Sequence, residues 1–374
     1  MSRLKELERF GQSVWLDFIR RGLLTGGGLR KLVEADGLKG VTSNPAIFEK
    51  AIGAGDEYRA LLVAAVRAGQ DDPEQIYEKL AIEDIQAAAD LMADVFEATS
   101  GRDGFVSLEV SPRLAHDTER TVAEAQRLWA AVSRPNLMVK VPATPAGIPA
   151  IERLIADGVN VNVTLLFSVD VYAQAADAYI KGLEHRLTAG KPIRTVASVA
   201  SFFVSRIDTE IDARLETMAA AASTELERDH LLTLRGKAAI ANAKTAYQRF
   251  GQVTGGERWR SLASHGAHVQ RLLWGSTGTK NPAYADTLYV DTLIGRDTVN
   301  TMPPATMDAF RDHGNPAATL EHDLEGARAA MNLLADAGIS LDAVTAKLLD
   351  DGVKLFDDAY TRLLDAVGKA KKAA

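Results

Sequence analysis

The chain has 374 residues, of which 47% are hydrophobic and 25% are charged, and it contains no cysteine. This composition suits a globular protein with a full core, and the lack of cysteine excludes disulfides, thiolate catalysis and cysteine metal sites. The formal net charge of −7, without a basic arm or stripe, argues against a protein that binds nucleic acid. No apolar stretch reaches the length of a membrane span, and the charged N-terminus lacks the apolar core of a signal peptide, so we expect a cytoplasmic protein without membrane partners.

Three short apolar segments in the first third of the chain predict strands that end in polar residues. These strands cover residues 13–19, 37–45 and 104–112. Apolar and polar side chains alternate along them, as they do in strands with two different faces. The polar side chains at or near the three strand ends are Asp17, Asn44 and Glu109.

The fourth predicted strand, residues 136–142, places a lysine inside an apolar run. Met138, Lys140 and Pro142 share one face of this strand, opposite three aliphatic side chains. Burial of an ammonium group disfavours its charged form, so a buried lysine amine becomes a better nucleophile. The alternative is a lysine that points into solvent from an edge strand, which the apolar flanks disfavour. The pattern therefore favours an amine that attacks a carbonyl and forms a Schiff base.

Four more strands, separated by helices, are predicted in the rest of the chain. They cover residues 158–168, 196–204, 269–276 and 286–291. The fifth strand carries Asn162 and Thr164 on one face, and the sixth carries Ser201 and leads into Arg206. The seventh strand ends at Ser276.

Eight short strands that alternate with helices predict an α/β fold, a (β/α)8 TIM barrel with additional helices. An open doubly wound sheet is the runner-up, but no dinucleotide-binding glycine fingerprint follows the first strand. No linker rich in proline, glycine or serine divides the chain, and no internal repeat is present. We therefore expect a single barrel domain over residues 1–374, with extra C-terminal helices at about residues 319–366.

In such a barrel, catalytic side chains lie at the carboxyl ends of the strands. Read in order, the predicted ends supply Asp17, Asn44, Glu109, Lys140, Asn162 with Thr164, Ser201 with Arg206, and Ser276. One lysine, two carboxylates and several hydroxyl and amide groups suit Schiff-base chemistry, in which the carboxylates move protons while a carbon–carbon bond is split. Each residue also has a structural alternative when taken singly. Asp17 or Glu109 could form an ion pair, and Asn44 could cap a helix.

Arg206, Ser276 and Lys280 form a second group near the ends of strands six and seven, where barrels often bind phosphate. Arginine can hold a phosphate bidentately, and lysine can hold it as a point charge. The segment 275–282 has the wrong spacing for a nucleotide-binding P-loop, so a sugar-phosphate site is preferred. The close pair His265 and His268 lacks the carboxylate partners of a metal site, and no metal is expected.

Two segments give the sequence a resemblance to a known family. Residues 40–48 read Gly-Val-Thr-Ser-Asn-Pro-Ala-Ile-Phe, and residues 137–148 read Leu-Met-Val-Lys-Val-Pro-Ala-Thr-Pro-Ala-Gly-Ile. Both resemble motifs of the transaldolase family of the pentose phosphate pathway, in its longer-chain bacterial branch. The stretches at 107–111, 160–168 and 201–207 support the resemblance, which runs from about residue 13 to the last helix.

The resemblance implies a class I barrel that needs no cofactor or metal. The implied reaction moves a dihydroxyacetone unit from sedoheptulose 7-phosphate to glyceraldehyde 3-phosphate, which yields erythrose 4-phosphate and fructose 6-phosphate. Lys140 would form the Schiff base, and Asp17 would be the general acid and base at the bond that is cleaved. Glu109, with Thr164, would position the water used in imine formation and release.

The resemblance also implies a set of substrate-binding residues. Asn44, Asn162 and Ser201 would bind the dihydroxyacetone hydroxyls, and Arg206 would bind the phosphate. In the shorter-chain branch of the family a second phosphate-binding arginine follows strand seven. The corresponding loop here, residues 276–280, contains no arginine, and we expect Lys280 to take that place.

Two other functions are kept as alternatives to the transfer reaction. One is an aldolase similar to fructose 6-phosphate aldolase, which would release free dihydroxyacetone. The other is a non-catalytic barrel that binds sugar phosphates, although binding alone needs no buried amine beside two acids. The partners expected in every case are sugar phosphates, and the sequence is compatible with a monomer or a homodimer.

Overall fold

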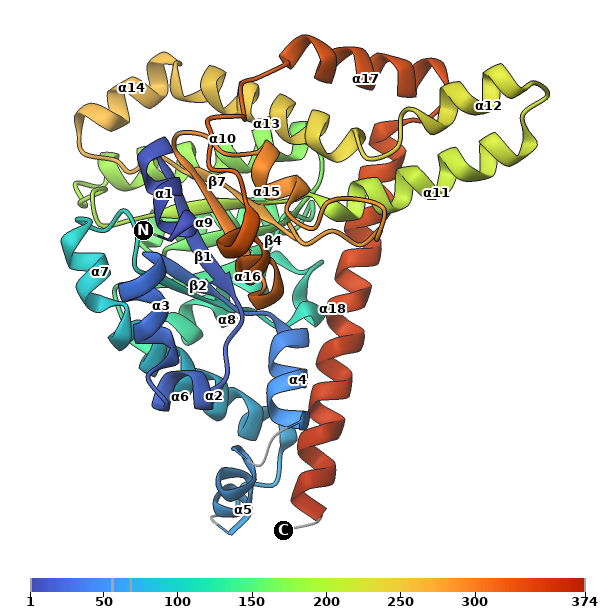
Figure 1. The fold of residues 1–374 in the computed structure, drawn as a ribbon. Coiled ribbons are helices and arrows are strands. Elements are labelled where there is room, and N and C mark those ends of the chain that lie inside the picture. Colours follow the sequence, from blue (N-terminus) through green and yellow to red (C-terminus); the bar gives the residue numbers. More distant parts are fainter. Residues whose placement is uncertain (1, 55–56, 68, 373–374) are drawn as a thin grey trace.

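In the computed structural model, which describes residues 2–54, 57–67 and 69–372, eight parallel strands close into a barrel (Figure 1). The strands are β1 (Gln12–Asp17), β2 (Gly40–Thr42), β3 (Phe105–Glu109), β4 (Leu137–Pro142), β5 (Val161–Leu166), β6 (Ser198–Phe203), β7 (Arg271–Gly275) and β8 (Thr298–Met302). Each strand pairs with the next one in the sequence, and β8 pairs with β1. The predicted (β/α)8 barrel is therefore confirmed.

Helices surround the barrel on its outer face (Figure 1). In the first half of the chain they are α1 (Arg3–Glu6), η1 (Leu7–Phe10), α2 (Arg21–Thr25), α3 (Gly28–Asp36), α4 (Pro45–Ala54), α5 (Arg59–Arg67), α6 (Pro73–Leu91), α7 (Ala93–Ala98), η2 (Pro112–Leu114), α8 (Thr118–Val132) and α9 (Gly147–Asp157). In the second half they are α10 (Val169–Thr188), α11 (Ser205–Ala221), α12 (Glu225–Leu232), α13 (Ala238–Thr254), α14 (Glu257–Ser264), α15 (Leu288–Thr292), α16 (Pro304–His313), α17 (Leu324–Asp336) and α18 (Leu341–Lys372). None of the described helices is both long enough and apolar enough to cross a membrane.

The position predicted for the eighth strand is wrong. Residues 288–291 of the predicted segment 286–291 lie in the short helix α15, and the strand lies further on, in β8. The search for apolar segments missed the eighth strand because β8 is largely polar, whereas a buried strand is expected to be apolar. Two of its polar side chains have partners that are distant in the sequence: Thr298 accepts a hydrogen bond from Gln12, and Oδ1 of Asn300 accepts one from Thr277.

The barrel interior is apolar in its middle layer. Trp15, Met138, Val199, Leu273 and Val299 belong to a buried cluster that is separate from the larger core between the sheet and the helices. Because side chains alternate along a strand, the residue two positions further on also points inward, one layer nearer the carboxyl end. Those residues are Asp17, Lys140, Ser201, Gly275 and Thr301. All five line a single cavity.

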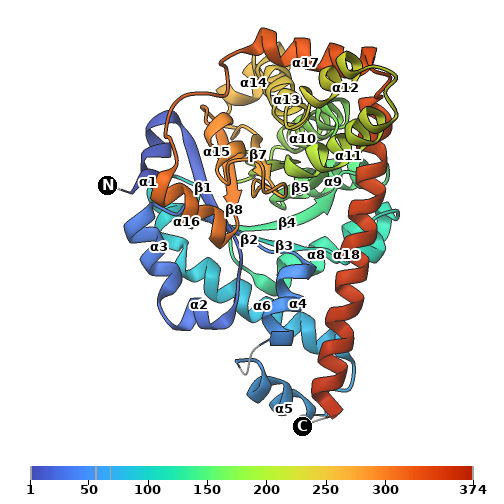
Figure 2. The ribbon, with the colours of Figure 1, turned by 45° about the vertical axis from the view of Figure 1, so that its right-hand side comes forward.

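The long helix α18 crosses the side of the barrel beside this cavity (Figure 2). It runs from the neighbourhood of α17 down to α5, and it packs against α4, α6, α11 and strand β5 on the way. Its apolar side chains Val344, Leu348, Phe356 and Leu363 are buried. The C-terminal segment therefore contributes side chains to the carboxyl end of the barrel.

Candidate active site

A cavity of about 130 Å³ lies at the carboxyl end of the barrel. Its lining includes eight of the predicted site residues: Asp17, Asn44, Lys140, Thr164, Ser201, Arg206, Ser276 and Lys280. The other two, Glu109 and Asn162, lie directly behind the lining, because Glu109 contacts Lys140 and Asn162 is bonded to Ser201. The structure thus brings all the predicted residues together.

Lys140 lies on the inward face of β4 and is only 5% exposed. Its Nζ donates a hydrogen bond of 2.9 Å to the backbone carbonyl of Ser43. The same nitrogen lies 3.3 Å from Oε2 of Glu109. The register of β3 and β4 places these two residues side by side, which explains why the amine meets a carboxylate at this depth.

The Glu109 carboxyl is held away from water at the end of β3. Burial raises its pKa above the ordinary value, and the charge of Asp17 raises it further, whereas Lys140 and Arg206 act in the opposite direction. Oε2 has the ion-pair contact with Lys140 but no hydrogen bond of good geometry. A buried carboxyl group with a raised pKa can take up a proton from a neighbouring group and return it.

Asp17, at the end of β1, is the second acid of the cavity. Its Oδ1 accepts a hydrogen bond of 2.7 Å from the Thr42 hydroxyl, and that hydroxyl lies 2.7 Å from the hydroxyl of Thr301. Burial raises the pKa of Asp17, and Lys140, the Thr42 hydrogen bond, Arg206 and Lys280 oppose the shift. The cavity therefore holds one amine and two acids, and the pKa of each acid is shifted upward by burial.

Ser201 and Thr164 are polar residues of the cavity lining, and Asn162 lies directly behind Ser201. Asn162 is fully buried, and its Oδ1 accepts a hydrogen bond of 2.6 Å from the Ser201 hydroxyl. Its Nδ2 donates to the hydroxyl of Ser107 at 3.1 Å. The hydroxyl of Thr164 is buried without a protein hydrogen-bond partner. A buried hydroxyl of this kind is explained by a ligand or an ordered water.

Asn44 caps a helix and also lies at the cavity. Its Oδ1 accepts a hydrogen bond of 3.0 Å from the backbone nitrogen of Ile47, as in the first turn of a helix. The residue also lines the cavity, where it is half-buried. Capping fixes the side chain, so its amide is held at a defined place in the cavity wall.

Arg206 enters the cavity from the first turn of α11 and rests against two aromatic rings. Its Cζ lies 5.0 Å from the centroid of Phe203 and 5.9 Å from that of Phe356. Burial lowers the pKa of the guanidinium, and the charges of Glu109 and Asp17 oppose this shift. Nη1 is buried without a hydrogen-bond partner. The rings thus position the cation and leave a donor available for an anion.

Ser276 and Lys280 lie in the loop that follows β7. Ser276 adopts a left-handed conformation with a φ of 56°, and its hydroxyl lies 2.8 Å from that of Ser205 at the start of α11. Lys280 is exposed at the mouth of the cavity. The hydroxyl contact holds the loop beside Arg206, so that two cations border the same side of the cavity.

Sequence reasoning missed several residues that line the cavity. They are Thr42, Phe203, Leu273, Gly275, Gly278, Thr301, Pro303 and Phe356. Thr42 and Phe203 could have been predicted as site residues, because each is the last residue of a strand. Thr301 was missed because the eighth strand was misplaced. Phe356 gave no signal, since an apolar stripe on a helix does not tell where the helix docks.

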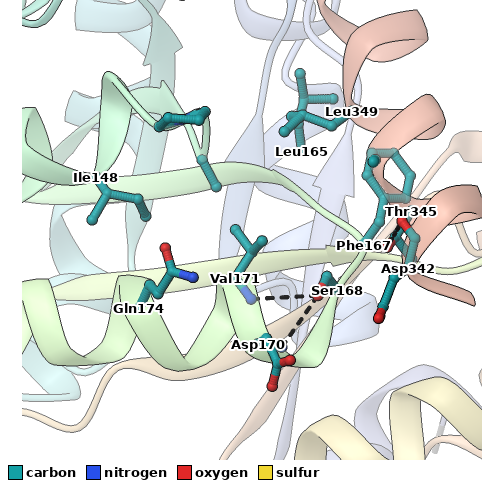
Figure 3. A pocket seen from close by; sticks show the side chains of 13 residues that line it. Ile148, Leu165, Phe167, Ser168, Asp170, Val171, Gln174, Asp342, Thr345 and Leu349 are labelled. Carbon is teal, nitrogen blue, oxygen red and sulfur yellow. Dashed lines mark hydrogen bonds between the residues drawn. The ribbon is translucent and has the colours of Figure 1, made fainter.

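A second cavity, of about 330 Å³, lies between α10 and the first turns of α18 (Figure 3). Ile148, Leu165, Phe167 and Leu349 give it an apolar lining, and Asp170 and Asp342 lie at its polar side. Among the residues that the structure describes, no lysine, arginine or histidine lines it. It therefore lacks the nucleophile and the cations of the Lys140 cavity.

Comparison with known proteins gives consistent matches along almost the whole chain. The family model described as transaldolase/fructose-6-phosphate aldolase matches residues 14–367. A transaldolase of Thiobacillus denitrificans is 48% identical over 368 residues, which cover 98% of this chain and 100% of the relative. A transaldolase of Trichodesmium erythraeum is 45% identical, with 99% and 98% covered. Transaldolase 1 of Streptomyces avermitilis is 47% identical, with 98% and 95% covered.

Proposed function

The chain belongs to the transaldolase/fructose-6-phosphate aldolase family, and from this premise we propose that it is a transaldolase. The proposed reaction moves a dihydroxyacetone unit from sedoheptulose 7-phosphate to glyceraldehyde 3-phosphate in the non-oxidative pentose phosphate pathway. Its products are erythrose 4-phosphate and fructose 6-phosphate. The observation that carries the proposal is the buried Lys140 amine, 3.3 Å from the Glu109 carboxylate, in the cavity at the carboxyl end of the barrel.

Imine formation is assigned to Lys140, Glu109 and Thr164. The Lys140 amine adds to the substrate carbonyl, and the resulting carbinolamine must lose water. Glu109 accepts a proton from the amine and returns it to the hydroxyl that leaves as water. The contact between Nζ and Oε2 supports this assignment. The Thr164 hydroxyl, which has no protein partner, holds that water.

Cleavage of the carbon–carbon bond is assigned to Asp17. Its carboxylate takes the proton from the hydroxyl on the carbon that becomes the aldehyde, and the bonding electrons move into the iminium. An aldose phosphate leaves, and a three-carbon enamine stays on Lys140. The enamine then attacks the acceptor aldehyde, Asp17 returns the proton, and water hydrolyses the new imine. The raised pKa of Asp17 suits a group that both takes and gives a proton.

Substrate binding is assigned to the polar groups around the amine. Asn44, Asn162 and Ser201 bind the hydroxyls of the dihydroxyacetone unit, because Asn44 and Ser201 line the cavity that holds Lys140 and Asn162 is hydrogen-bonded to Ser201. Arg206, Ser276 and Lys280 bind the phosphate at the opposite end of the sugar. The unpartnered Nη1 of Arg206 supports this assignment.

The other two functions are less well supported. The similar proteins are named transaldolases, which favours transfer to an acceptor over release of free dihydroxyacetone. A non-catalytic barrel has no use for a buried amine in contact with a carboxylate, since such a pair is costly to desolvate.

Trapping with borohydride tests the proposal. Incubation with fructose 6-phosphate and borohydride is expected to attach a reduced three-carbon unit to Lys140, which peptide mass spectrometry locates. Lys280→Met is the matched control, because it removes a cavity lysine that forms no imine and is expected to leave the label in place. A label on another residue, or no label on the wild type, would refute the Schiff-base mechanism.

A further inference from the structure

One side chain of the cavity comes from the C-terminal helix rather than from the barrel. Phe356 lies on α18, is 6% exposed and lines the same cavity as Lys140. Helix α18 passes along the side of the barrel at this point (Figure 2). The ring is therefore part of the cavity wall, although the helix that carries it is an addition to the eight βα units.

The ring of Phe356 faces the two cations on which the proposed reaction depends. Its centroid lies 6.0 Å from Nζ of Lys140 and 5.9 Å from Cζ of Arg206. An aromatic face attracts a cation without accepting a conventional hydrogen bond. Both side chains are thus held near the ring while their N–H groups stay available, and Nη1 of Arg206 has no other partner.

The helix backbone also comes close to the site one turn before Phe356. A Cβ atom on Gly352 would lie 2.9 Å from Cδ2 of Leu165 and 3.5 Å from Nη1 of Arg206. Only a glycine fits this distance without a shift of Leu165. This part of α18 thus packs closely against the barrel, and the Phe356 ring lies beside Lys140, which is 5% exposed.

We propose that Phe356 is a positioning residue that aims Arg206 at the substrate phosphate and keeps bulk water away from the imine on Lys140. This inference rests on the proposed function. Release of dihydroxyacetone needs a proton on the enamine carbon and a water molecule on the iminium carbon, and it yields free dihydroxyacetone and the free amine. An apolar side chain that excludes water beside Lys140 slows this release, so that the enamine is still present when the acceptor aldehyde binds.

The test compares Phe356→Leu with Tyr360→Leu. The first variant keeps an apolar side chain but removes the ring from the cavity. The second removes a buried ring one turn further along α18, where it packs against Tyr77 and lies outside the lining. For each variant we would measure KM and kcat for fructose 6-phosphate, and the ratio of free dihydroxyacetone to transferred units.

Phe356→Leu is expected to raise KM about tenfold, as the loss of a partly desolvated cation–π contact implies, and to raise the release ratio severalfold. Tyr360→Leu is expected to lower the melting temperature and to leave both quantities unchanged. The inference is overturned when Phe356→Leu behaves as the wild type, or when Tyr360→Leu shifts KM and the ratio equally. Failure of the proposed function is distinct, because the wild type would then show no borohydride label on Lys140.

Discussion

Each end of the barrel interior buries one cation beside one carboxylate. At the amino end, Arg271 and Asp103 are 2.8 Å apart, with side chains 4% and 5% exposed. At the carboxyl end, Lys140 and Glu109 are 3.3 Å apart, with side chains 6% and 5% exposed. The two ion pairs are thus buried to the same extent and carry the same charges. They differ in the hydrogen bonds that neighbouring groups make around them.

The amino-end pair is completed by neighbouring protein groups. Arg271 donates to the hydroxyl of Ser13 at 2.7 Å, to the carbonyl of Arg102 at 2.6 Å and to Asp103. Asp103 also accepts hydrogen bonds from Ser13 at 2.8 Å and from the indole of Trp15 at 3.1 Å. This network closes the barrel floor, and nothing in it points to a ligand.

The carboxyl-end pair lies among polar atoms that have no protein partner. Apart from the ion-pair contact of Glu109 with Lys140, Oε2 of Glu109, Oγ1 of Thr164 and Nη1 of Arg206 are buried without a hydrogen bond to any of the described residues. Buried polar groups are normally satisfied, so three unsatisfied groups near one amine indicate a site that is completed by substrate or water. The comparison teaches that a buried ion pair indicates a functional site where polar atoms around it lack hydrogen-bond partners.

The largest expected effect comes from Lys140→Met at the carboxyl end. The variant loses the amine that forms the imine, so kcat is expected to fall by at least about 10⁴-fold. The variant should also lose less stability than the same substitution at the amino end, because the pKa of Glu109 is already raised and that carboxyl can become neutral. Steady-state kinetics measure the fall in kcat, and urea unfolding measures the loss of stability. Residual activity near the wild-type level would remove Lys140 from the reaction.

The matched substitution Arg271→Met at the amino end is expected to have the opposite profile. It leaves the Asp103 carboxylate buried without its cation, at a cost of about 3 to 5 kcal/mol in the free energy of unfolding. At a temperature where the variant is folded, KM and kcat should stay at the wild-type values. If Arg271→Met loses activity without losing stability, the structural role of the amino-end pair is refuted.

A third buried carboxylate, Asp208 on α11, tests whether hydrogen bonds can replace a cation. It accepts hydrogen bonds of 2.8 Å from the Tyr289 hydroxyl and from the backbone nitrogen of Ala239. Burial nevertheless raises the pKa of Asp208 to about 6. The folded state therefore binds the proton more tightly than the unfolded state, and stability from this group is lost as pH rises from about 4 to about 6.

We expect the wild type to lose about 2 kcal/mol relative to Asp208→Asn between pH 4.5 and pH 7, since the variant cannot titrate at this position. Urea unfolding of both proteins across this range measures the difference. Parallel stability curves for the two proteins would show that the hydrogen bonds fully compensate the missing cation.

The contrast between the two ends also explains what the sequence could predict. Lys140, Glu109 and Asp17 were found because an ionisable residue at the end of an apolar strand is rare in a structural role. Arg271 begins a strand in the same way, yet its partner Asp103 precedes β3, and no pattern shows that they meet. Strand β8 was misplaced for a related reason, since its polar side chains find partners only in the closed barrel.

The smallest effect is expected at Thr42, which supports the second acid of the carboxyl end. Its hydroxyl donates to Oδ1 of Asp17 and lowers the pKa of that carboxyl against the effect of burial. Thr42→Val removes this hydrogen bond, so the pKa of Asp17 should rise further. The acidic limb of kcat/KM, where Asp17 loses its proton, should then move to higher pH, and kcat should fall roughly tenfold, as for the loss of a hydrogen bond to a charged group.

Thr301→Val is the matched control for this prediction. The Thr301 hydroxyl lies 2.7 Å from that of Thr42, and it reaches Asp17 only through Thr42. Its removal should therefore move the acidic limb less than Thr42→Val does. An equal shift in both variants would mean that cavity shape, and not the hydrogen bond to Asp17, controls the limb. The role of the Thr42 hydroxyl in setting the pKa of Asp17 would then be refuted.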